Sequence, residues 1–469
     1  MTTIQEESVR EVKSKTAHWA HQLYGHGLMK ERDCILNWDM GTGKTKAVVD
    51  FIANDRGPGL HLIMCPLSVV PVWEGEFEKH GADPKSTEVV LLNTGSTDKS
   101  ADKVTQILRM REYKCLKSAM SRTVFVVNYD SAWIRRLGMA LKEIDWRVVV
   151  CDEIHRIKGP SGKASRFASK LKACRRIGLT GTLMPHGPLD AWAQFRFIDP
   201  DILGRSYTRF KSYYAIPHPF IRGATTGYRN THEMMKILAP YTHRVEKSEV
   251  LDLPPVAHQT IPIALSSSGQ KVYKKMEDDL VVEIKSGAVT ASNGLVRLLR
   301  LQQITSGFLG DETVDTSKQN ALSEIYESLA DDEPIVVFCE FHHDLDVIIK
   351  TAVKHGRKAW ELSGRKKQLA TWKEQGGVLA VQIHAGGVGV DMTNACYCVY
   401  YSMGYSLGDY LQSLARLDRH GQTRPVSYLH LVAQGTVDVQ TYKAMAQKLN
   451  VVTHLLELLK HERKHNEGG

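Results

Sequence analysis

Short runs of apolar, largely β-branched residues recur along the chain between segments whose hydrophobic positions repeat at helical spacing. Runs of this kind, without polar alternation, are typical of strands that are buried on both faces of a parallel sheet. They form two series, residues 35–36, 62–65, 124–127 and 148–151, and then residues 335–339, 378–381, 396–401 and 428–432. The pattern therefore predicts an α/β protein with two parallel sheets flanked by helices.

Strand signals fade between the two series, over about residues 200–330. Helical patterns at residues 268–282 and 295–304 replace them, which indicates helical insertions. The double proline in Leu253-Pro254-Pro255 forbids a continuing helix and indicates a linker. We expect an N-terminal lobe over residues 1–248 with a helical protrusion near 200–245, and a C-terminal lobe over 249–469 with a helical insertion near 266–330.

The composition is that of an ordinary globular protein. Hydrophobic residues make up 42% of the 469 residues and charged residues 24%, so the chain can bury a sizeable core and is not disordered as a whole. The 61 Lys and Arg residues exceed the 52 Asp and Glu residues by nine. This mild positive surplus favours an anionic partner without establishing one.

The eight cysteines never form a Cys-x-x-Cys pair, and most stand inside apolar runs, where a thiol packs as a small buried side chain. This favours a reducing compartment and argues against a zinc module. Residues 1–15 lack the apolar core of a signal peptide, and no apolar stretch reaches about 18 uncharged residues. We expect a cytoplasmic protein that does not act at a membrane, or one in the host-cell cytoplasm if the source is viral.

A glycine-rich loop follows the first apolar run and precedes a helix-compatible segment; it reads Asp39-Met40-Gly41-Thr42-Gly43-Lys44-Thr45. A strand, a glycine loop and a helix in this order are what a phosphate-binding loop requires. Loop N–H groups would bind phosphate oxygens, Lys44 would reach the terminal phosphates and Thr45 would ligate magnesium. Trp38 stands where the strict pattern has its first glycine, so an incidental glycine turn stays open as the alternative.

An acidic pair, Asp152 and Glu153, follows the apolar run at 148–151. Asp152 would hold the metal directly or through a water, and Glu153 would polarise the attacking water. Alone, such a pair could be an ordinary solvated loop. Together with the glycine loop upstream, it indicates a nucleoside triphosphatase.

Six further segments accompany these two sites: residues 18–22 (HWAHQ), 65–73 (CPLSVVPVW), 179–182 (LTGT), 253–255 (LPP), 385–391 (AGGVGVD) and 412–426 (QSLARLDRHGQTRPV). In this order they resemble the motifs of superfamily-two helicase-related ATPases. More narrowly, they are similar to those of Swi/Snf-type DNA-dependent ATPases, the family of chromatin remodellers and their bacterial and viral relatives. The resemblance covers about residues 17–446. It implies two RecA-like lobes with a nucleotide cleft between them, and a compact bacterial or viral member.

The resemblance also implies roles at the ATP site for residues of both lobes. Gln22 would read the adenine, while Gly387 and Gly389 would carry the nucleotide-facing loop of the second lobe. Arg416 and Arg419 would act as arginine fingers, because charge that spreads over the transferred phosphoryl group requires cations that arrive on closure. The alternative for the two arginines, three positions apart, is a solvated basic stripe on one helix face.

Candidate DNA contacts follow predicted strands, on the side where open α/β sheets bind ligands. A grip that ignores base sequence comes from backbone amides, hydroxyls and basic side chains. By analogy with the family, the candidates are Ser68, Asn128, Arg156, Lys158, Thr180, His342 and Arg365. Arg156 and Lys158 are the favoured pair, and Thr180 and Thr182 would couple the nucleotide site to DNA.

These features predict a monomeric DNA-dependent ATPase that uses ATP and Mg²⁺ to move along double-stranded DNA and to remodel DNA or protein–DNA complexes. Three alternatives stay open: a strand-separating or annealing helicase, an RNA helicase of the Asp-Glu-x-His type, and a nucleotide-controlled DNA clamp or scaffold with little turnover. Residues 421–426 count against the RNA helicase. Slow ATP hydrolysis that duplex DNA does not stimulate would favour the clamp.

Overall fold

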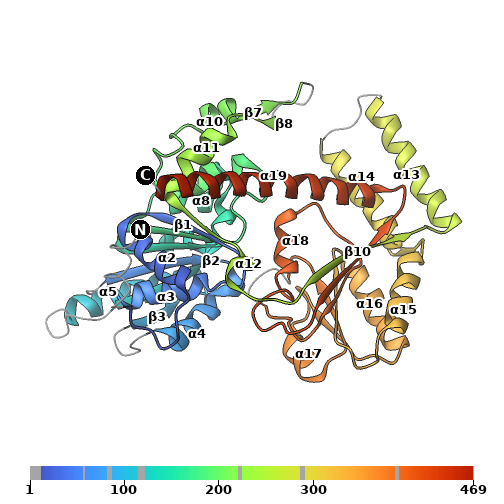
Figure 1. The fold of residues 1–469 in the computed structure, drawn as a ribbon, viewed down its shortest axis with the longest axis horizontal. Coiled ribbons are helices and arrows are strands. Elements are labelled where there is room, and N and C mark those ends of the chain that lie inside the picture. The colour runs from blue at the N-terminus through green and yellow to red at the C-terminus, as the bar shows by residue number, and fades with distance from the viewer. Residues whose placement is uncertain are drawn as a thin grey trace. The chain divides into compact units, whose positions relative to one another are not determined.

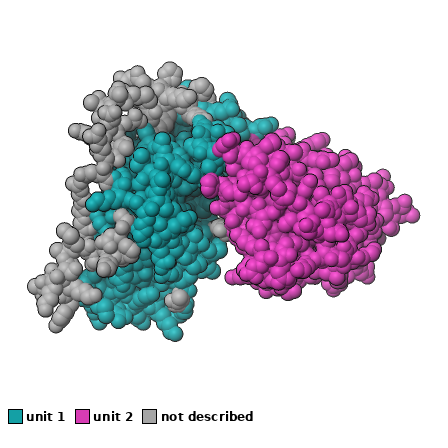
Figure 2. Space-filling view, turned by 60° about the horizontal axis from the view of Figure 1, so that its bottom comes forward, with its two compact units in different colours: residues 1–251, 450–469 teal, residues 252–449 magenta. Residues whose placement is uncertain are grey.

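The chain divides into two compact units (Figure 2). The computed structural model describes residues 12–55, 59–81, 87–93, 95–114, 122–219, 224–285, 291–385 and 390–467. Unit 1 comprises residues 1–251 and 450–469, and unit 2 comprises residues 252–449. The first division lies close to the boundary expected at 248/249. Residues 450–469 are grouped with unit 1 rather than with the C-terminal lobe, because Leu455 and Leu459 are buried in the core of unit 1.

Unit 1 is built on a seven-stranded sheet in which all neighbouring strands are parallel. The strand order is β3-β4-β2-β5-β6-β1-β9. The strands are β1 (Cys34–Trp38), β2 (Gly59–Cys65), β3 (Thr87–Leu91), β4 (Arg122–Asn128), β5 (Asp145–Asp152), β6 (Lys172–Thr180) and β9 (Thr242–Val245). Every residue of β1 is buried, as expected for a strand covered on both faces.

Helices flank this sheet (Figure 1). They are α2 (Ala20–Glu31), α3 (Lys44–Ala53), α4 (Val70–His80), α5 (Thr97–Lys114), α6 (Tyr129–Ala132), α7 (Arg135–Glu143), α8 (Lys163–Ala168) and α9 (Ala191–Ile198), with short 3₁₀ turns η1 (Leu67–Val69), η2 (Ile154–Ile157), η3 (Pro188–Asp190) and η4 (Ala239–Tyr241). The short helix α12 (Lys247–Val250) follows β9. The expected protrusion contains α10 (Tyr207–Tyr214) and α11 (Thr231–Leu238). It also contains an antiparallel hairpin of β7 (Ala215–Pro217) and β8 (Thr225–Tyr228), which the helical pattern did not predict.

Unit 2 carries a six-stranded sheet, also parallel throughout, with the order β10-β17-β16-β13-β15-β14. Its strands are β10 (Val256–Ile263), β13 (Ile335–Cys339), β14 (Ala359–Leu362), β15 (Val378–Gln382), β16 (Tyr397–Tyr400) and β17 (Val426–Ala433). Its helices are α13 (Ser267–Lys285), α14 (Ala291–Ser306), α15 (Ser317–Ser328), α16 (His342–Lys354), α17 (Leu369–Gln375) and α18 (Leu407–Leu414), and a small hairpin pairs β11 (Phe308–Leu309) with β12 (Glu312–Thr313). The last helix, α19 (Val437–Glu467), begins here and ends in unit 1.

The predicted α/β fold with two parallel sheets is confirmed. The range expected for the helical insertion, near 266–330, contains α13, α14 and α15 and also the β11–β12 hairpin, which the helical pattern did not predict. Helices α13 and α14 pack against each other. Buried free thiols occur at Cys34, Cys65, Cys151, Cys339, Cys396 and Cys398, whereas Cys174 is exposed and Cys115 lies outside the described residues. Within the described part of the chain, no helix combines the length and the apolar character needed to cross a membrane.

Candidate ATP site and nucleic-acid interface

The carboxyl ends of the central strands of unit 1 carry the predicted site residues along one edge of the sheet. In sheet order, β4 ends at Asn128, Ser68 follows β2, β5 ends at Asp152 and β6 ends at Thr180. The glycine loop follows β1, the next strand. Because parallel strands end on the same side, the sheet brings together residues that are far apart in sequence.

Two glycines of the loop have a backbone conformation that other residues rarely adopt. Gly41 and Gly43 have φ angles of 83° and 80°, in the left-handed region that favours glycine. The Lys44 ammonium group donates hydrogen bonds to the carbonyl oxygens of Trp38 (2.8 Å) and Asp39 (3.1 Å). The lysine thus folds back over the loop, and Trp38 contributes a carbonyl group, which any residue could supply at this position.

Side chains of helix α2 contact the same loop. The ring nitrogen Nε2 of His21 lies 2.8 Å from the Thr42 carbonyl oxygen. The Gln22 side-chain amide accepts a hydrogen bond from the Trp19 N–H (3.0 Å) and donates one to the Gly43 carbonyl (3.4 Å). A Cβ atom on Gly43 would lie only 2.2 Å from the Gln22 amide nitrogen. Gln22 is therefore fixed beside the glycine loop, while its contact with adenine stays a prediction.

The acidic pair stands at the end of β5, next to the strand that leads to η1. The buried Asp152 accepts a hydrogen bond at Oδ2 from the Trp73 indole N–H (3.2 Å), and its backbone carbonyl accepts one from the Tyr129 hydroxyl (2.7 Å). Glu153 has a φ angle of 51°. A residue other than glycine rarely adopts this conformation, and such strain is concentrated at functional sites.

The charges of the two loops act on one another. Burial raises the pKa of the Asp152 carboxyl group, and the neighbouring Glu153 charge raises it further, while Lys44 opposes both. Burial likewise lowers the pKa of the Lys44 ammonium group, against the carboxylates of Glu153, Asp152 and Asp39. Oxygen atoms of Asp152 and Thr45 are the kind of ligand that magnesium prefers. A divalent cation would also relieve the crowding of the two carboxylates, so these residues fit a magnesium ion.

His155 joins the acidic pair to the end of β6, and the sequence interpretation did not single it out. Its Nδ1 atom lies 3.3 Å from Glu153 Oε2 and 3.0 Å from the Thr180 hydroxyl. The Thr182 N–H donates to that hydroxyl (3.0 Å). A chain of polar contacts therefore runs from Glu153 to Thr182. The spacing Asp-Glu-x-His was the signal that could have identified His155. Thr180 is fully buried, which suits a coupling role better than direct contact with DNA.

The other DNA-contact candidates of unit 1 differ in exposure. Ser68 and Arg156 are exposed, Lys158 is half-buried and Asn128 is buried. Arg156 lies in η2, and this 3₁₀ turn begins directly after the strained Glu153. A phosphate contact at Arg156 or Lys158 would thus be only a few residues from the acidic pair. Their contact with DNA stays a prediction.

The arginines predicted as fingers do not share a helix face, because α18 ends at Leu414 and both lie in the turns that follow. Their guanidinium groups nevertheless converge: Nη1 of Arg416 and Nη1 of Arg419 lie 3.4 and 3.3 Å from the carbonyl oxygen of Val390. Arg416 is buried, which excludes a fully solvated stripe. Val390 directly follows the predicted nucleotide-facing loop, whose Gly387 and Gly389 lie outside the described residues.

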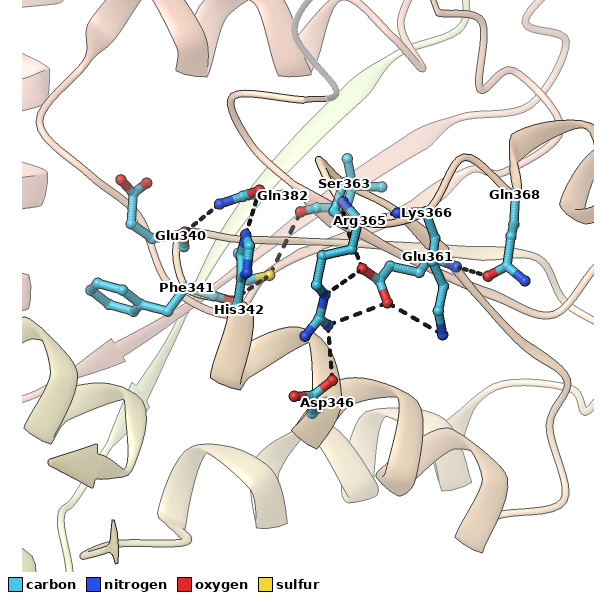
Figure 3. A network of polar contacts seen from close by, with 12 residues as sticks. Glu340, Phe341, His342, Asp346, Glu361, Ser363, Arg365, Lys366, Gln368 and Gln382 are labelled. Carbon is cyan, nitrogen blue, oxygen red and sulfur yellow. Dashed lines mark hydrogen bonds and ion pairs between the residues drawn. The ribbon is translucent and has the colours of Figure 1, made fainter. Parts of the chain in front are cut away.

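His342 and Arg365 lie at the carboxyl ends of β13 and β14 (Figure 3). The exposed His342 ring is 3.2 Å from the Gln382 side-chain oxygen. Arg365 is paired with Asp346 (2.9 Å) and Glu361 (3.0 Å), and these carboxylates raise the pKa of its guanidinium group. Arg365 would have to exchange a carboxylate for a phosphate to bind DNA, so this contact remains a prediction.

Comparison with known proteins gives consistent results along the chain. A model of the SNF2-related domain matches residues 13–307, and one of the helicase conserved C-terminal domain matches residues 317–421. An uncharacterised ATP-dependent helicase of Mycoplasma genitalium is 27% identical over 442 residues, which are 90% of this chain and 40% of that protein. An ATP-dependent DNA helicase of Arabidopsis thaliana is 23% identical over 93% of this chain and 60% of its own length.

Among solved structures, the SWI2/SNF2 ATPase core of Sulfolobus solfataricus in complex with dsDNA is 22% identical, with a TM-score of 0.43 over 97% of this chain and 98% of that one. The chain spans less than two thirds of the length of both curated relatives. The SNF2-related domain alone matches well over half of the chain. The chain therefore belongs to the SNF2-related family of helicase-type ATPases.

Proposed function

We propose that this protein hydrolyses ATP with Mg²⁺ and uses the energy to move along double-stranded DNA, remodelling DNA or protein–DNA complexes. Family membership supports the ATPase class. The observation that carries the proposal is that the glycine loop with Lys44 follows β1, while Asp152 and Thr180 end the neighbouring strands β5 and β6. This arrangement supports a site in which a phosphate-binding loop, a metal-binding acid and a coupling segment act together.

The residues of unit 1 have distinct tasks in the proposed reaction. The loop N–H groups and Lys44 bind the phosphate oxygens, and Thr45 and Asp152 hold the magnesium ion. Magnesium, when bound, polarises the phosphoryl oxygens and neutralises their charge. Glu153 orients the attacking water and accepts its proton. Because His155 contacts both Glu153 and Thr180, a movement of the Glu153 carboxylate also moves the His155 ring and, through it, Thr180.

Arg416 and Arg419 supply positive charge to the transferred phosphoryl group in this proposal. Their convergence on one carbonyl group supports a joint role, since a single segment orients both guanidinium groups. Charge that builds up only in the transition state is stabilised by donors that are already oriented. The family resemblance supplies the assignment of this role to the two arginines.

Duplex DNA is the proposed track. The net charge of +9 supports an anionic partner, and the plant relative that covers most of this chain is named a DNA helicase. Exposed Ser68 and Arg156 at the sheet edge offer a hydroxyl group and a cation, which bind phosphate without reading bases. Movement without strand separation distinguishes this proposal from a strand-separating helicase.

The test is the ATPase rate with duplex DNA, single-stranded DNA and RNA at one fixed salt concentration, because phosphate contacts weaken steeply with ionic strength. We expect duplex DNA to stimulate hydrolysis most, and we expect displacement of a triplex-forming strand without separation of the duplex. Separation of the duplex would favour the helicase alternative. Slow hydrolysis that no nucleic acid stimulates would favour a nucleotide-controlled clamp.

A further inference from the structure

Two aromatic side chains hold Asp152 in place from neighbouring elements of unit 1. Trp73, on α4, donates its indole N–H to the carboxylate oxygen Oδ2 (3.2 Å). Tyr129, the first residue of α6, donates its hydroxyl to the backbone carbonyl of the same residue (2.7 Å). The side chain and the backbone of Asp152 are thus each held by one of the two aromatic residues.

Because Trp73 is buried, its indole N–H cannot donate to water instead of to Asp152. Trp73 has no exposed surface, and Asp152 is 8% exposed. An indole N–H can only donate, and a buried donor without an acceptor is costly. Trp73 also packs against Phe77 one turn along α4, with ring centroids 6.4 Å apart. The indole is therefore held in place by its own helix while it binds one of the two carboxylate oxygens.

We propose that Trp73 is a positioning residue for ATP hydrolysis, whose indole N–H fixes the Asp152 carboxylate in the orientation that holds magnesium. The inference rests on the proposed function, in which Asp152 is a magnesium ligand. It also goes beyond that function, because the proposed function gives Trp73 no task, and its indole N–H acts through Asp152. The competing explanation is that Trp73 serves only to fill the interior of unit 1.

Replacing Trp73 by phenylalanine tests this role. Trp73→Phe keeps an aromatic ring and removes the N–H donor. Hydrogen bonds to charged groups are among the stronger ones, so we expect the affinity for ATP in the presence of Mg²⁺ to fall roughly tenfold. Affinity without Mg²⁺ should stay unchanged. The probe is ATP that carries a fluorescent methylanthraniloyl group, titrated once in Mg²⁺ and once in EDTA. We also expect kcat to be lower in this variant than in the unchanged protein.

Trp146→Phe is the matched control. Trp146 is also fully buried in unit 1, and its indole N–H donates to the Leu141 carbonyl (2.9 Å) rather than to Asp152. We expect this variant to lose stability without a change in the Mg²⁺ dependence of ATP binding. If Trp73→Phe does not fold, benzothienylalanine at position 73 replaces the N–H by sulfur at nearly constant shape and gives the same readout.

Tyr129→Phe gives a second, independent measurement. Loss of the Tyr129 hydroxyl should also weaken Mg²⁺-dependent ATP binding. The double variant should lose less than the sum of the two single losses, since both act through Asp152. Additive losses would show that the two side chains act separately, and this would contradict a shared role in orienting one carboxylate.

The proposal on Trp73 is wrong if the Mg²⁺ dependence of ATP binding is the same in Trp73→Phe and the unchanged protein. It is also wrong if Trp146→Phe shifts this dependence equally. Failure of the proposed function is distinguishable from both results. It would be seen as hydrolysis in the unchanged protein that duplex DNA does not stimulate, whereas the binding measurement on Trp73→Phe needs no DNA.

Discussion

Single side chains set the chemistry at the sheet edge, and Glu153 is the most constrained of them. Its left-handed backbone places the carboxylate beside His155, at a conformational cost of about 1 kcal/mol or more. We expect Glu153→Gln, which keeps the shape but cannot accept the proton of water, to lower the ATPase rate by about 100-fold or more. Binding of ATP and of DNA should persist. Turnover near that of the unchanged protein would contradict the assignment.

Arg419 offers a second test at this scale. If it stabilises the transferred phosphoryl group, Arg419→Ala should leave the ATP dissociation constant near normal and lower kcat by about 1,000-fold. The control is Arg424→Ala, because Arg424 lies in the same segment but is paired with Glu333 (2.9 Å). Steady-state kinetics and fluorescent-ATP binding separate the two quantities. Loss of ATP binding alone would show that Arg419 is not a finger.

Asp344 should make stability depend on pH. Burial raises its pKa from the ordinary value of 3.8 to about 7, against hydrogen bonds from Ser402 and the Phe341 N–H. Since the pKa is higher in the folded state, the contribution of this group is complete below about pH 4 and is lost as the pH rises through 7. Three pKa units correspond to no more than roughly 4 kcal/mol.

The neutral variant Asp344→Asn should therefore unfold at higher denaturant concentration than the unchanged protein at pH 8, and the two should converge near pH 4. Denaturant titrations across this pH range measure the difference in the free energy of unfolding. Asp332→Asn, at an exposed position, should not change the pH profile. Equal profiles for Asp344→Asn and the unchanged protein would rule out a buried, titrating Asp344.

Strands were predictable from the sequence where both of their faces are buried, and less predictable where part of the strand is exposed. The apolar runs correspond to β1, β2, β4, β5, β13, β15, β16 and β17. The missed strands include β3, β9, β10 and β14, which are the four edge strands of the two sheets. An edge strand is covered on fewer sides and keeps polar residues; β10, for example, is mostly exposed. β6 was missed because charged residues, including Arg175 and Arg176, occupy its first half.

In the candidate site, too, some residues could be predicted from the sequence and others could not. The glycine loop and the acidic pair are contiguous in sequence, and each follows a buried strand, so their chemistry could be predicted. Trp73 and Tyr129 reach Asp152 from segments that are far from it in sequence. Only the order β4-β2-β5 in the sheet brings them together. Sequence reasoning therefore finds the reacting groups, but it does not find the side chains that hold them.

The contact between α2 and the glycine loop yields a prediction for these two elements. Gly43→Ala would place a methyl group 2.2 Å from the Gln22 amide nitrogen at a φ angle of +80°, which costs about 1–2 kcal/mol before any clash. We expect ATP affinity to fall about tenfold or more, measured with the fluorescent analogue. Gly27→Ala on α2, where an added Cβ would meet no atom within 4 Å beyond its chain neighbours and its own helix backbone, should instead stabilise the helix slightly. Normal ATP binding by Gly43→Ala would show that the loop needs neither the conformation nor the contact.

At the scale of the whole molecule, the two units have separate hydrophobic cores, which predicts more than one unfolding transition. One core contains Phe125 and Trp146 in unit 1, and another contains Val337 and Leu345 in unit 2. A ligand stabilises the part of a protein that binds it. ATP with Mg²⁺ should therefore raise the melting temperature of the unit 1 transition and identify it among the others.

Helix α19 makes this identification useful, because its two ends belong to different cores. Val437, its first residue, packs in a core of unit 2, whereas Leu455 is 2% exposed in the core of unit 1. Leu455→Ala removes buried methyl groups and should cost unit 1 about 2–5 kcal/mol. In calorimetry, the unit 1 transition is the one whose melting temperature ATP raises. In Leu455→Ala this transition should occur at a lower temperature than in the unchanged protein, while the melting temperature of the unit 2 transition stays the same. Leu449→Ala, at a position on the same helix that is 36% exposed, should shift neither by a comparable amount. If Leu455→Ala lowered only the transition that ATP does not raise, the end of α19 would belong to unit 2, and the division of the chain would follow the sequence boundary after all.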